Sequence, residues 1–182
     1  PVHLLVWTTT PWTLPLNRAV ALRPDTSYSL CRMGDTCVVI GTSLIDSLRA
    51  KLAVEVQELS RFNGDVLTGV QVQHPFIPGF NVPIIFDQMV TLDDGTACVH
   101  CAPGCGAEDY EAGLKNGLEI FSAVSPSGHY MHGIQPVELE GMSVTDGQWW
   151  VLKQLEARGT LFHKTSLKHQ YPHCWRCRNG LI

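Results

Sequence analysis

Short runs of strand-forming residues, repeatedly interrupted by proline and glycine, are the feature that most limits what this chain can fold into. The 182 residues include 11 prolines and 16 glycines. Proline cannot donate to a sheet ladder and glycine weakens a strand interior, so long regular strands are excluded. We expect short strands over 2–7, 18–22, 28–33, 36–40, 54–59, 70–72, 82–86, 90–92, 96–101, 120–124 and 160–171.

Three other segments have helical rather than strand periodicity. The segment 43–52 spaces its apolar residues three and four apart behind a serine, and 107–116 and 145–158 each end at a glycine. Helices inserted at intervals among many short strands favour a mixed, β-rich α/β fold. We expect a closed or half-closed β-barrel-like core with helices packed at its ends, rather than a doubly wound sheet. The one boundary expected lies at Tyr171-Pro172.

Charge and cysteine content narrow the functional class. Residues 1–150 hold 7 Lys/Arg against 16 Asp/Glu, whereas 151–182 hold 6 against 1, so a polyanion would be met near the C-terminal segment. No apolar run reaches the ~18 residues that a membrane span needs. Seven cysteines with no secretory signal indicate reduced thiols in a cytoplasmic protein.

The first chemically suggestive segment runs from Trp7 to Asn17 and contains three consecutive threonines before Pro11. Side chains alternate along a strand, so Thr8 and Thr10 should share one face while Thr9 takes the other. Two hydroxyls and the Asn17 amide can orient a water molecule or an ester. The alternative is that this segment is an ordinary strand without a functional role, which ends at the two prolines.

The second such segment runs from Asp94 to Tyr110 as a strand, a Pro/Gly bend and a helix start. Alternation places Cys98 and His100 on one face and Cys101 on the other, so the three should not chelate one ion. Cys105 near the helix start is a candidate nucleophile with His100 as its base, which would make a cysteine hydrolase. Small buried filler is the ordinary use of such a cysteine.

Together these two segments resemble a known family. The letters WTTTPWTLP at 7–15 with Asn17, and the GT, VH, APG and EDY elements between 95 and 110, look like the editing domain inserted in isoleucyl-tRNA synthetases. Valyl and leucyl relatives share this domain, but Thr10-Pro11-Trp12 favours the isoleucyl branch. The resemblance covers essentially the whole chain, with 1–171 as the editing domain and 172–182 as the start of a zinc-knuckle segment that rejoins the parent enzyme.

The resemblance implies hydrolysis of mischarged Val-tRNA(Ile), and of Val-adenylate as a further candidate substrate. Asp109 would hold the α-ammonium group, because a charge-assisted hydrogen bond of this kind contributes ~1.5–3 kcal/mol. Thr10 and Asn17 would position the attacking water, with Thr8 and Thr9 lining the pocket. An aminoacyl ester is already activated, so no covalent intermediate or cofactor is needed.

His100 and Trp12 receive different roles from the resemblance. His100 would limit the room for the amino-acid side chain and so exclude isoleucine. Trp12 would border the substrate and hold the bend open with the two prolines. Ala97 stands where the family usually has glycine, and Cys105 stands where it often has histidine. These two differences should affect the shape of the pocket more than the type of reaction.

Cys174 and Cys177 have zinc-knuckle spacing, but a structural zinc needs four ligands. The resemblance implies that the pair completes a site with two cysteines lying before the insertion; His173 or His169 is the alternative ligand. The expected partners are the 3′ end of tRNA(Ile) charged with valine and the rest of the parent synthetase, and the domain is expected to be a monomer. A non-catalytic tRNA- or zinc-binding module that uses the basic segment from Lys153 to Arg178 remains the alternative outside the enzymes.

Overall fold

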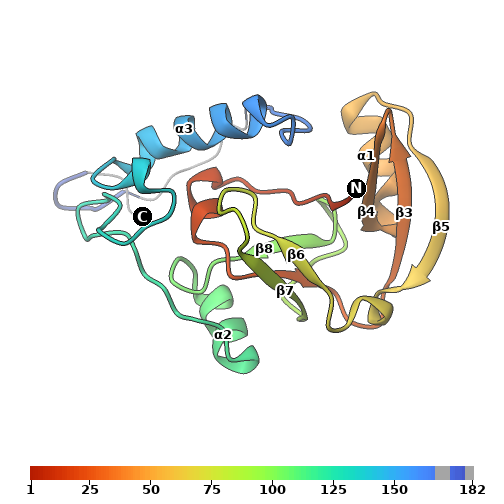
Figure 1. Ribbon diagram of the computed structural model, residues 1–182, viewed down its shortest axis with the longest axis horizontal. Coiled ribbons are helices and arrows are strands. Elements are labelled where there is room, and N and C mark those ends of the chain that lie inside the picture. Colours follow the sequence, from red (N-terminus) through yellow and green to blue (C-terminus); the bar gives the residue numbers. More distant parts are fainter. Residues whose placement is uncertain (167–172, 179–182) are drawn as a thin grey trace.

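The computed structural model describes residues 1–166 and 173–178, and it contains eight strands and three α-helices within them (Figure 1). The strands are β1 (Val2–Leu4), β2 (Ala19–Leu22), β3 (Ser27–Met33), β4 (Thr36–Gly41), β5 (Gln57–Asn63), β6 (Gln71–Gln73), β7 (Asn81–Phe86) and β8 (Cys98–Cys101). The α-helices are α1 (Ile45–Leu52), α2 (Ala107–Asn116) and α3 (Val144–Ala157). Short 3₁₀ helices are η1 (Pro11–Leu16), η2 (Thr42–Leu44), η3 (Gly64–Leu67) and η4 (Val137–Leu139).

The strands form two separate four-stranded sheets of mixed direction. Their orders are β1-β4-β3-β5 and β6-β7-β2-β8, and α1 lies against the first sheet while α3 lies at the opposite end of the molecule (Figure 1). The mixed α/β class is confirmed. The expected closed or half-closed barrel is not confirmed, because among the described residues each edge strand has a single neighbour and neither sheet closes on itself.

Several local predictions hold and others do not. The two strands expected over 28–33 and 36–40 are confirmed as β3 and β4, which form an antiparallel hairpin at Gly34 with Met33 opposite Thr36. Strand β1 ends at Leu4, and the chain beyond it turns into η1 because Pro11 occupies the first helical turn, where its missing N–H costs nothing. The strand expected over 54–59 begins later, as β5, after Ala53 adopts a left-handed conformation.

Three further predicted strands are wrong within the described residues. No strand forms over 90–92 or 120–124, where Val124 makes only an isolated bridge to Tyr130, and 160–166 has no regular structure. Val90 is buried without strand pairing, and residues 160–166 are mostly exposed, so none of the three segments has, in the described part of the chain, a neighbouring strand that would extend a ladder. The rest of the expected last strand and the Tyr171-Pro172 boundary lie outside the described residues.

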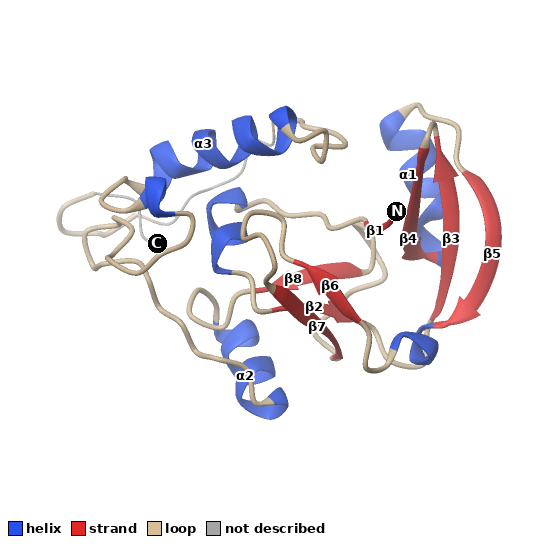
Figure 2. Cartoon of the chain, in the orientation of Figure 1, coloured by secondary structure: helices blue, strands red, loops and turns tan. Residues whose placement is uncertain are grey.

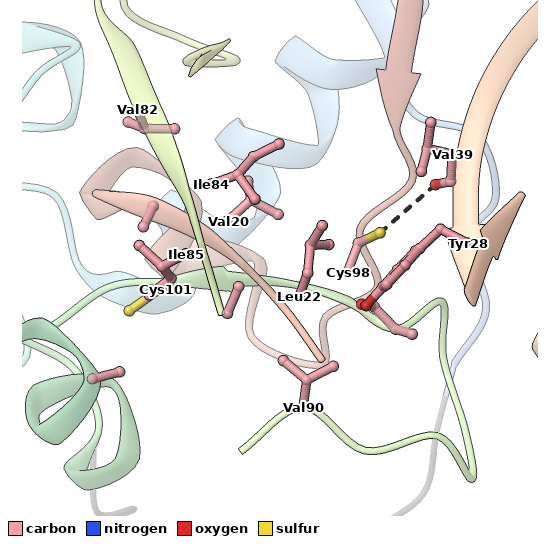
Figure 3. Packing of buried hydrophobic residues seen from close by; sticks show 14 of the residues in the cluster. Val20, Leu22, Tyr28, Val39, Val82, Ile84, Ile85, Val90, Cys98 and Cys101 are labelled. Carbon is pink, nitrogen blue, oxygen red and sulfur yellow. Dashed lines mark hydrogen bonds between the residues drawn. The ribbon is translucent and has the colours of Figure 1, made fainter. Parts of the chain in front are cut away.

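The core centres on β2, whose four residues are all buried. It pairs in parallel with β7 and antiparallel with β8. The two sheets meet at the start of β8, where Cys98 Sγ donates to the Val39 carbonyl at 3.7 Å (Figure 3). Beside it, Tyr28 Oη donates to the Ala97 carbonyl at 2.8 Å. This junction fixes β8, which carries the histidine of the second motif.

None of the helices in the described part of the chain has both the length and the apolar character of a bilayer crossing.

Candidate functional site

A cavity of about 520 Å³ opens between the threonine segment and the start of α2. This volume falls within the ~300–1,000 Å³ range of small-molecule sites. Its walls come from the residues before and within η1, the loop ahead of β8, β8 itself and the first turn of α2. The two sequence motifs, separated by the 76 residues from 18 to 93, therefore share one cavity.

The three threonines all line this cavity. The hydroxyl oxygens of Thr8 and Thr10 lie 3.4 Å apart, and Thr8 Oγ1 accepts a hydrogen bond from the Thr10 N–H at 3.0 Å. Thr8 and Thr10 therefore lie together, as expected, but the expectation that Thr9 takes the other face is wrong, because Thr9 lines the same cavity. The chain bends at Thr9 instead of continuing as a strand, so Thr9 reaches the cavity as well.

Trp12 and Asn17 lie behind the cavity wall and do not line it. Trp12 packs against an apolar cluster that includes Tyr130, whose hydroxyl donates to the Trp12 carbonyl at 2.6 Å. Figure 2 shows η1 between the second sheet and α3. Asn17 is only 3% exposed, and its Oδ1 accepts a hydrogen bond from the Cys101 N–H at 3.2 Å. Both side chains are placed to hold the wall rather than to touch a molecule inside it.

Asp109 faces the cavity from the first turn of α2. Its Oδ2 accepts a hydrogen bond from the Ala102 N–H at 2.8 Å, and no described side chain donates to Oδ1. Burial raises the pKa of Asp109, the Ala102 N–H opposes this, and the charge of Glu108 adds to it. A cation bound at the free oxygen would offset the cost of burying this carboxylate.

Two glycines allow α2 to bring Asp109 to this position. A Cβ on Gly104 would lie 2.1 Å from the Phe121 carbonyl oxygen, and one on Gly113 would lie 2.8 Å from Pro103. Both contacts are far shorter than van der Waals distance. The bend before α2 and the packing of the helix on that bend therefore require glycine at both places.

His100 forms part of the cavity wall on β8 and is 7% exposed. Its Nε2 lies 3.0 Å from Thr13 Oγ1, while the buried Nδ1 has no hydrogen-bond partner. Burial lowers the pKa of His100 to about 4. At neutral pH the ring is therefore uncharged and acts as a fixed, bulky wall.

The geometry does not favour Cys105 as a nucleophile. Burial raises the pKa of its thiol to about 11, and the charge of Asp109 adds to the effect. The nucleophilic form of cysteine is the thiolate, which this environment suppresses. Within the described residues no hydrogen bond joins Cys105 to His100, whose Nε2 is engaged by Thr13.

Ala97 has an unusual backbone conformation. Its φ is +57°, a conformation that L-residues other than glycine adopt at a cost of roughly 1–2 kcal/mol. A Cβ on Gly41 would lie 2.6 Å from the Ala97 methyl. A glycine, which the resemblance implies at this position, would suit the left-handed backbone, and the present methyl is accommodated because residue 41 has no side chain.

Cys174 and Cys177 lie in the second described segment. Hydrogen bonds from the backbone N–H groups of Cys177 and Arg176 lower the pKa of the Cys174 thiol, which suits a metal-binding thiolate. Among the described residues no group of three or more His, Cys, Asp and Glu side chains could hold a metal ion. Zinc binding by this pair stays a prediction, and the alternative ligand His169 lies outside the described residues.

Sequence reasoning missed several residues of the cavity. Thr13 is the most informative, because it joins η1 to His100; Trp7 and Asp94 stand at the mouth, half-exposed and exposed respectively. The sequence does contain a feature that indicates the position of Thr13. Proline at position 11 marks a helix start, and a residue three positions after Thr10 then folds back onto its carbonyl.

The chain is similar in sequence to a known protein over its whole length. No protein-family model matches the chain. Over all 182 residues it is 41% identical to isoleucine–tRNA ligase of Sodalis glossinidius (strain morsitans), of which it covers 19%. The chain thus spans about a fifth of the length of that relative.

Solved structures resemble it in fold. The structure of GlLeuRS-CP1 matches with a TM-score of 0.68 and 14% identity, covering 87% of this chain and 82% of that one. The editing domain of cytosolic leucyl-tRNA synthetase from P. falciparum matches with a TM-score of 0.63 and 11% identity, covering 86% and 77%. At such low identity these matches establish the fold alone.

Proposed function

We propose that this chain, which belongs to the isoleucine–tRNA ligase family and has the fold of leucyl-tRNA synthetase editing domains, hydrolyses the ester of mischarged Val-tRNA(Ile). The observation that carries the proposal is the shared cavity. It holds three threonines, a carboxylate with one unengaged oxygen and a buried neutral histidine. These are the groups that a small, positively charged aminoacyl ester requires.

The selection problem gives this cavity a purpose. One methylene in an apolar pocket is worth only ~1–3 kcal/mol, and the choice between isoleucine and valine by this family of synthetases is the well-known example of a difference that binding alone cannot resolve. A second cavity too small for isoleucine reverses the problem, because the wrong amino acid enters and the right one does not. His100 supplies the wall that sets this limit.

Asp109 anchors the substrate in this mechanism. Its unengaged Oδ1 accepts a hydrogen bond from the α-ammonium group. The Ala102 N–H donates to Oδ2 and so fixes the orientation of the carboxylate. Fixing the ester beside a positioned water lowers the entropic part of the barrier. No protein nucleophile is required, since the ester is already activated.

Thr10 and Asn17 contribute at different distances from the ester. Thr10 is exposed, lines the cavity and carries a hydroxyl that can orient the water, with Thr8 and Thr9 beside it. The Oδ1 atom of Asn17 accepts the hydrogen bond of the Cys101 N–H. Asn17 therefore acts as a positioning residue that holds β8 and, through it, the histidine wall.

The partners follow from the same proposal. The 3′ end of tRNA(Ile) delivers the ester, and the remainder of a parent synthetase supplies most of the tRNA surface, since the chain covers 19% of its relative. Zinc bound by Cys174 and Cys177 would stabilise the local fold with two further ligands from that enzyme. Zinc plays no part in the hydrolysis.

A deacylation assay with Val-tRNA(Ile) tests the proposal. The chain should release valine, and Asp109→Asn should abolish release while keeping the melting temperature. Glu111→Gln is the matched control, because Glu111 is exposed on the same helix and its loss removes the same charge. Equal turnover by Asp109→Asn and the control would refute the anchor, and absence of valine release by the unaltered chain would refute the function.

A further inference from the structure

Thr13 links the helical turn after the threonines to the histidine wall. It lies in η1 and is 5% exposed. Its hydroxyl donates to the Thr10 carbonyl at 2.8 Å and also lies 3.0 Å from His100 Nε2. One buried hydroxyl thus touches both the residue expected to orient water and the residue expected to exclude isoleucine.

The two contacts together determine where the histidine carries its proton. A threonine hydroxyl has one hydrogen to donate and lone pairs to accept with. Because that hydrogen points to the Thr10 carbonyl, both bonds form at once only if His100 Nε2 carries a hydrogen and donates it to Thr13. A neutral imidazole has a single N–H, so Nδ1 is then the bare nitrogen.

The other ring nitrogen gives the ring no second anchor. Nδ1 of His100 is buried and without a partner. The bond to Thr13 is the one hydrogen bond that holds the imidazole among the described residues, and it joins β8 to η1 across the cavity wall. Without it, the ring would lose the contact that selects one tautomer and one orientation.

We propose that Thr13 is a specificity-determining positioning residue, which fixes His100 as the Nε2–H tautomer and holds its ring where it limits the cavity. The inference rests on the proposed editing function for its consequence but not for its geometry. A ring released from Thr13 can take other orientations, and the cavity then admits one more methylene. Thr13 lines the cavity beside His100, and its proposed effect on specificity acts through the histidine ring.

Two measurements test it, and the first does not depend on activity. Nitrogen-15 NMR of the chain should show His100 with a protonated Nε2 and an unprotonated Nδ1; the resonances are assigned by their loss in His100→Gln. His74 serves as an internal reference, because its Nδ1 accepts hydrogen bonds from the Phe76 and Ile77 N–H groups and its proton must also sit on Nε2. A His100 protonated on Nδ1 in the unaltered chain overturns the proposal.

The second measurement compares Thr13→Val with Thr13→Ser. Valine keeps the shape but removes the hydroxyl, so it should give mixed His100 tautomers and raise hydrolysis of Ile-tRNA(Ile) by roughly tenfold or more. Serine keeps the hydroxyl and should restore both the single tautomer and the exclusion of isoleucine. If Thr13→Val retains the Nε2–H tautomer or still spares Ile-tRNA(Ile), the positioning role is wrong. Failure of the unaltered chain to release valine would refute the editing function and leave the tautomer result standing.

Discussion

Asn17 and Asp109 accept hydrogen bonds from the backbone N–H groups of two successive residues, Cys101 and Ala102. One acceptor follows η1 and the other stands in the first turn of α2, so the end of β8 is held from both motifs at once. The backbone after β8 is therefore the point at which the two halves of the site are assembled.

This arrangement predicts that Asn17→Ala lowers stability as well as activity. The substitution leaves the buried Cys101 N–H without an acceptor, which costs ~1–3 kcal/mol, and denaturant unfolding measures the loss. Thr10→Ala is the comparison, because Thr10 is exposed and its change should stay within about 0.5 kcal/mol while valine release falls. A stable Asn17→Ala protein with no activity would instead assign Asn17 directly to the water.

Removing the histidine wall should alter selectivity. His100→Ala enlarges the cavity, and we expect it to hydrolyse correctly charged Ile-tRNA(Ile) while still releasing valine from Val-tRNA(Ile). Deacylation of both substrates by the variant measures this directly. Continued protection of Ile-tRNA(Ile) would show that something other than this ring sets the size limit.

Acid should destabilise the protein through its two buried histidines. Burial lowers the pKa of His100 to about 4, and burial with the charge of Arg18 does the same for His74, from an ordinary 6.5. The unfolded chain therefore binds these protons first, so stability is complete above about pH 6.5 and falls as the pH drops toward 4. The loss is at most about 3 kcal/mol for each histidine.

The contribution of one histidine can be isolated by comparing variants. Unfolding free energies of the unaltered chain and of His100→Gln should converge as the pH falls from 6.5 to 4, because glutamine does not titrate. A constant difference across that range would mean that His100 has the same pKa in the folded and unfolded chains.

Gly41 and Ala97 should behave as a coupled pair. Gly41 has an ordinary φ of −61°, so Gly41→Ala is disfavoured only by the 2.6 Å approach to the Ala97 methyl; overpacking of this kind costs ~1–3 kcal/mol. Ala97→Gly removes that methyl and relieves the left-handed backbone, so the double variant should recover most of the loss. Strictly additive effects in thermal unfolding would contradict the coupling.

Local signals predicted much of the fold and of the site. The turn at Gly34 and the helix ending at Gly117 were predictable because both glycines supply the positive φ that these turns need. Thr8, Thr10, His100 and Asp109 meet in one cavity, as the paired motifs indicated. What local patterns could not supply was the pairing of distant strands, so a barrel was expected where two open sheets form.

The roles of Asn17 and Thr13 were hidden for a related reason. Asn17 bonds to a backbone N–H in a strand 84 positions away, and backbone partners leave no mark on the sequence. Pro11 was interpreted as a strand breaker, although it also begins η1 and thereby turns Thr13 toward His100. Sequence patterns therefore reveal least about tertiary contacts whose partner is a backbone group or an ordinary buried hydroxyl.

The central claim is tested most directly by the rates at which the chain releases the amino acid from Val-tRNA(Ile) and from Ile-tRNA(Ile), measured side by side against spontaneous hydrolysis. We predict release of valine at least roughly tenfold faster than release of isoleucine. Equal rates, or faster release of isoleucine, would contradict it.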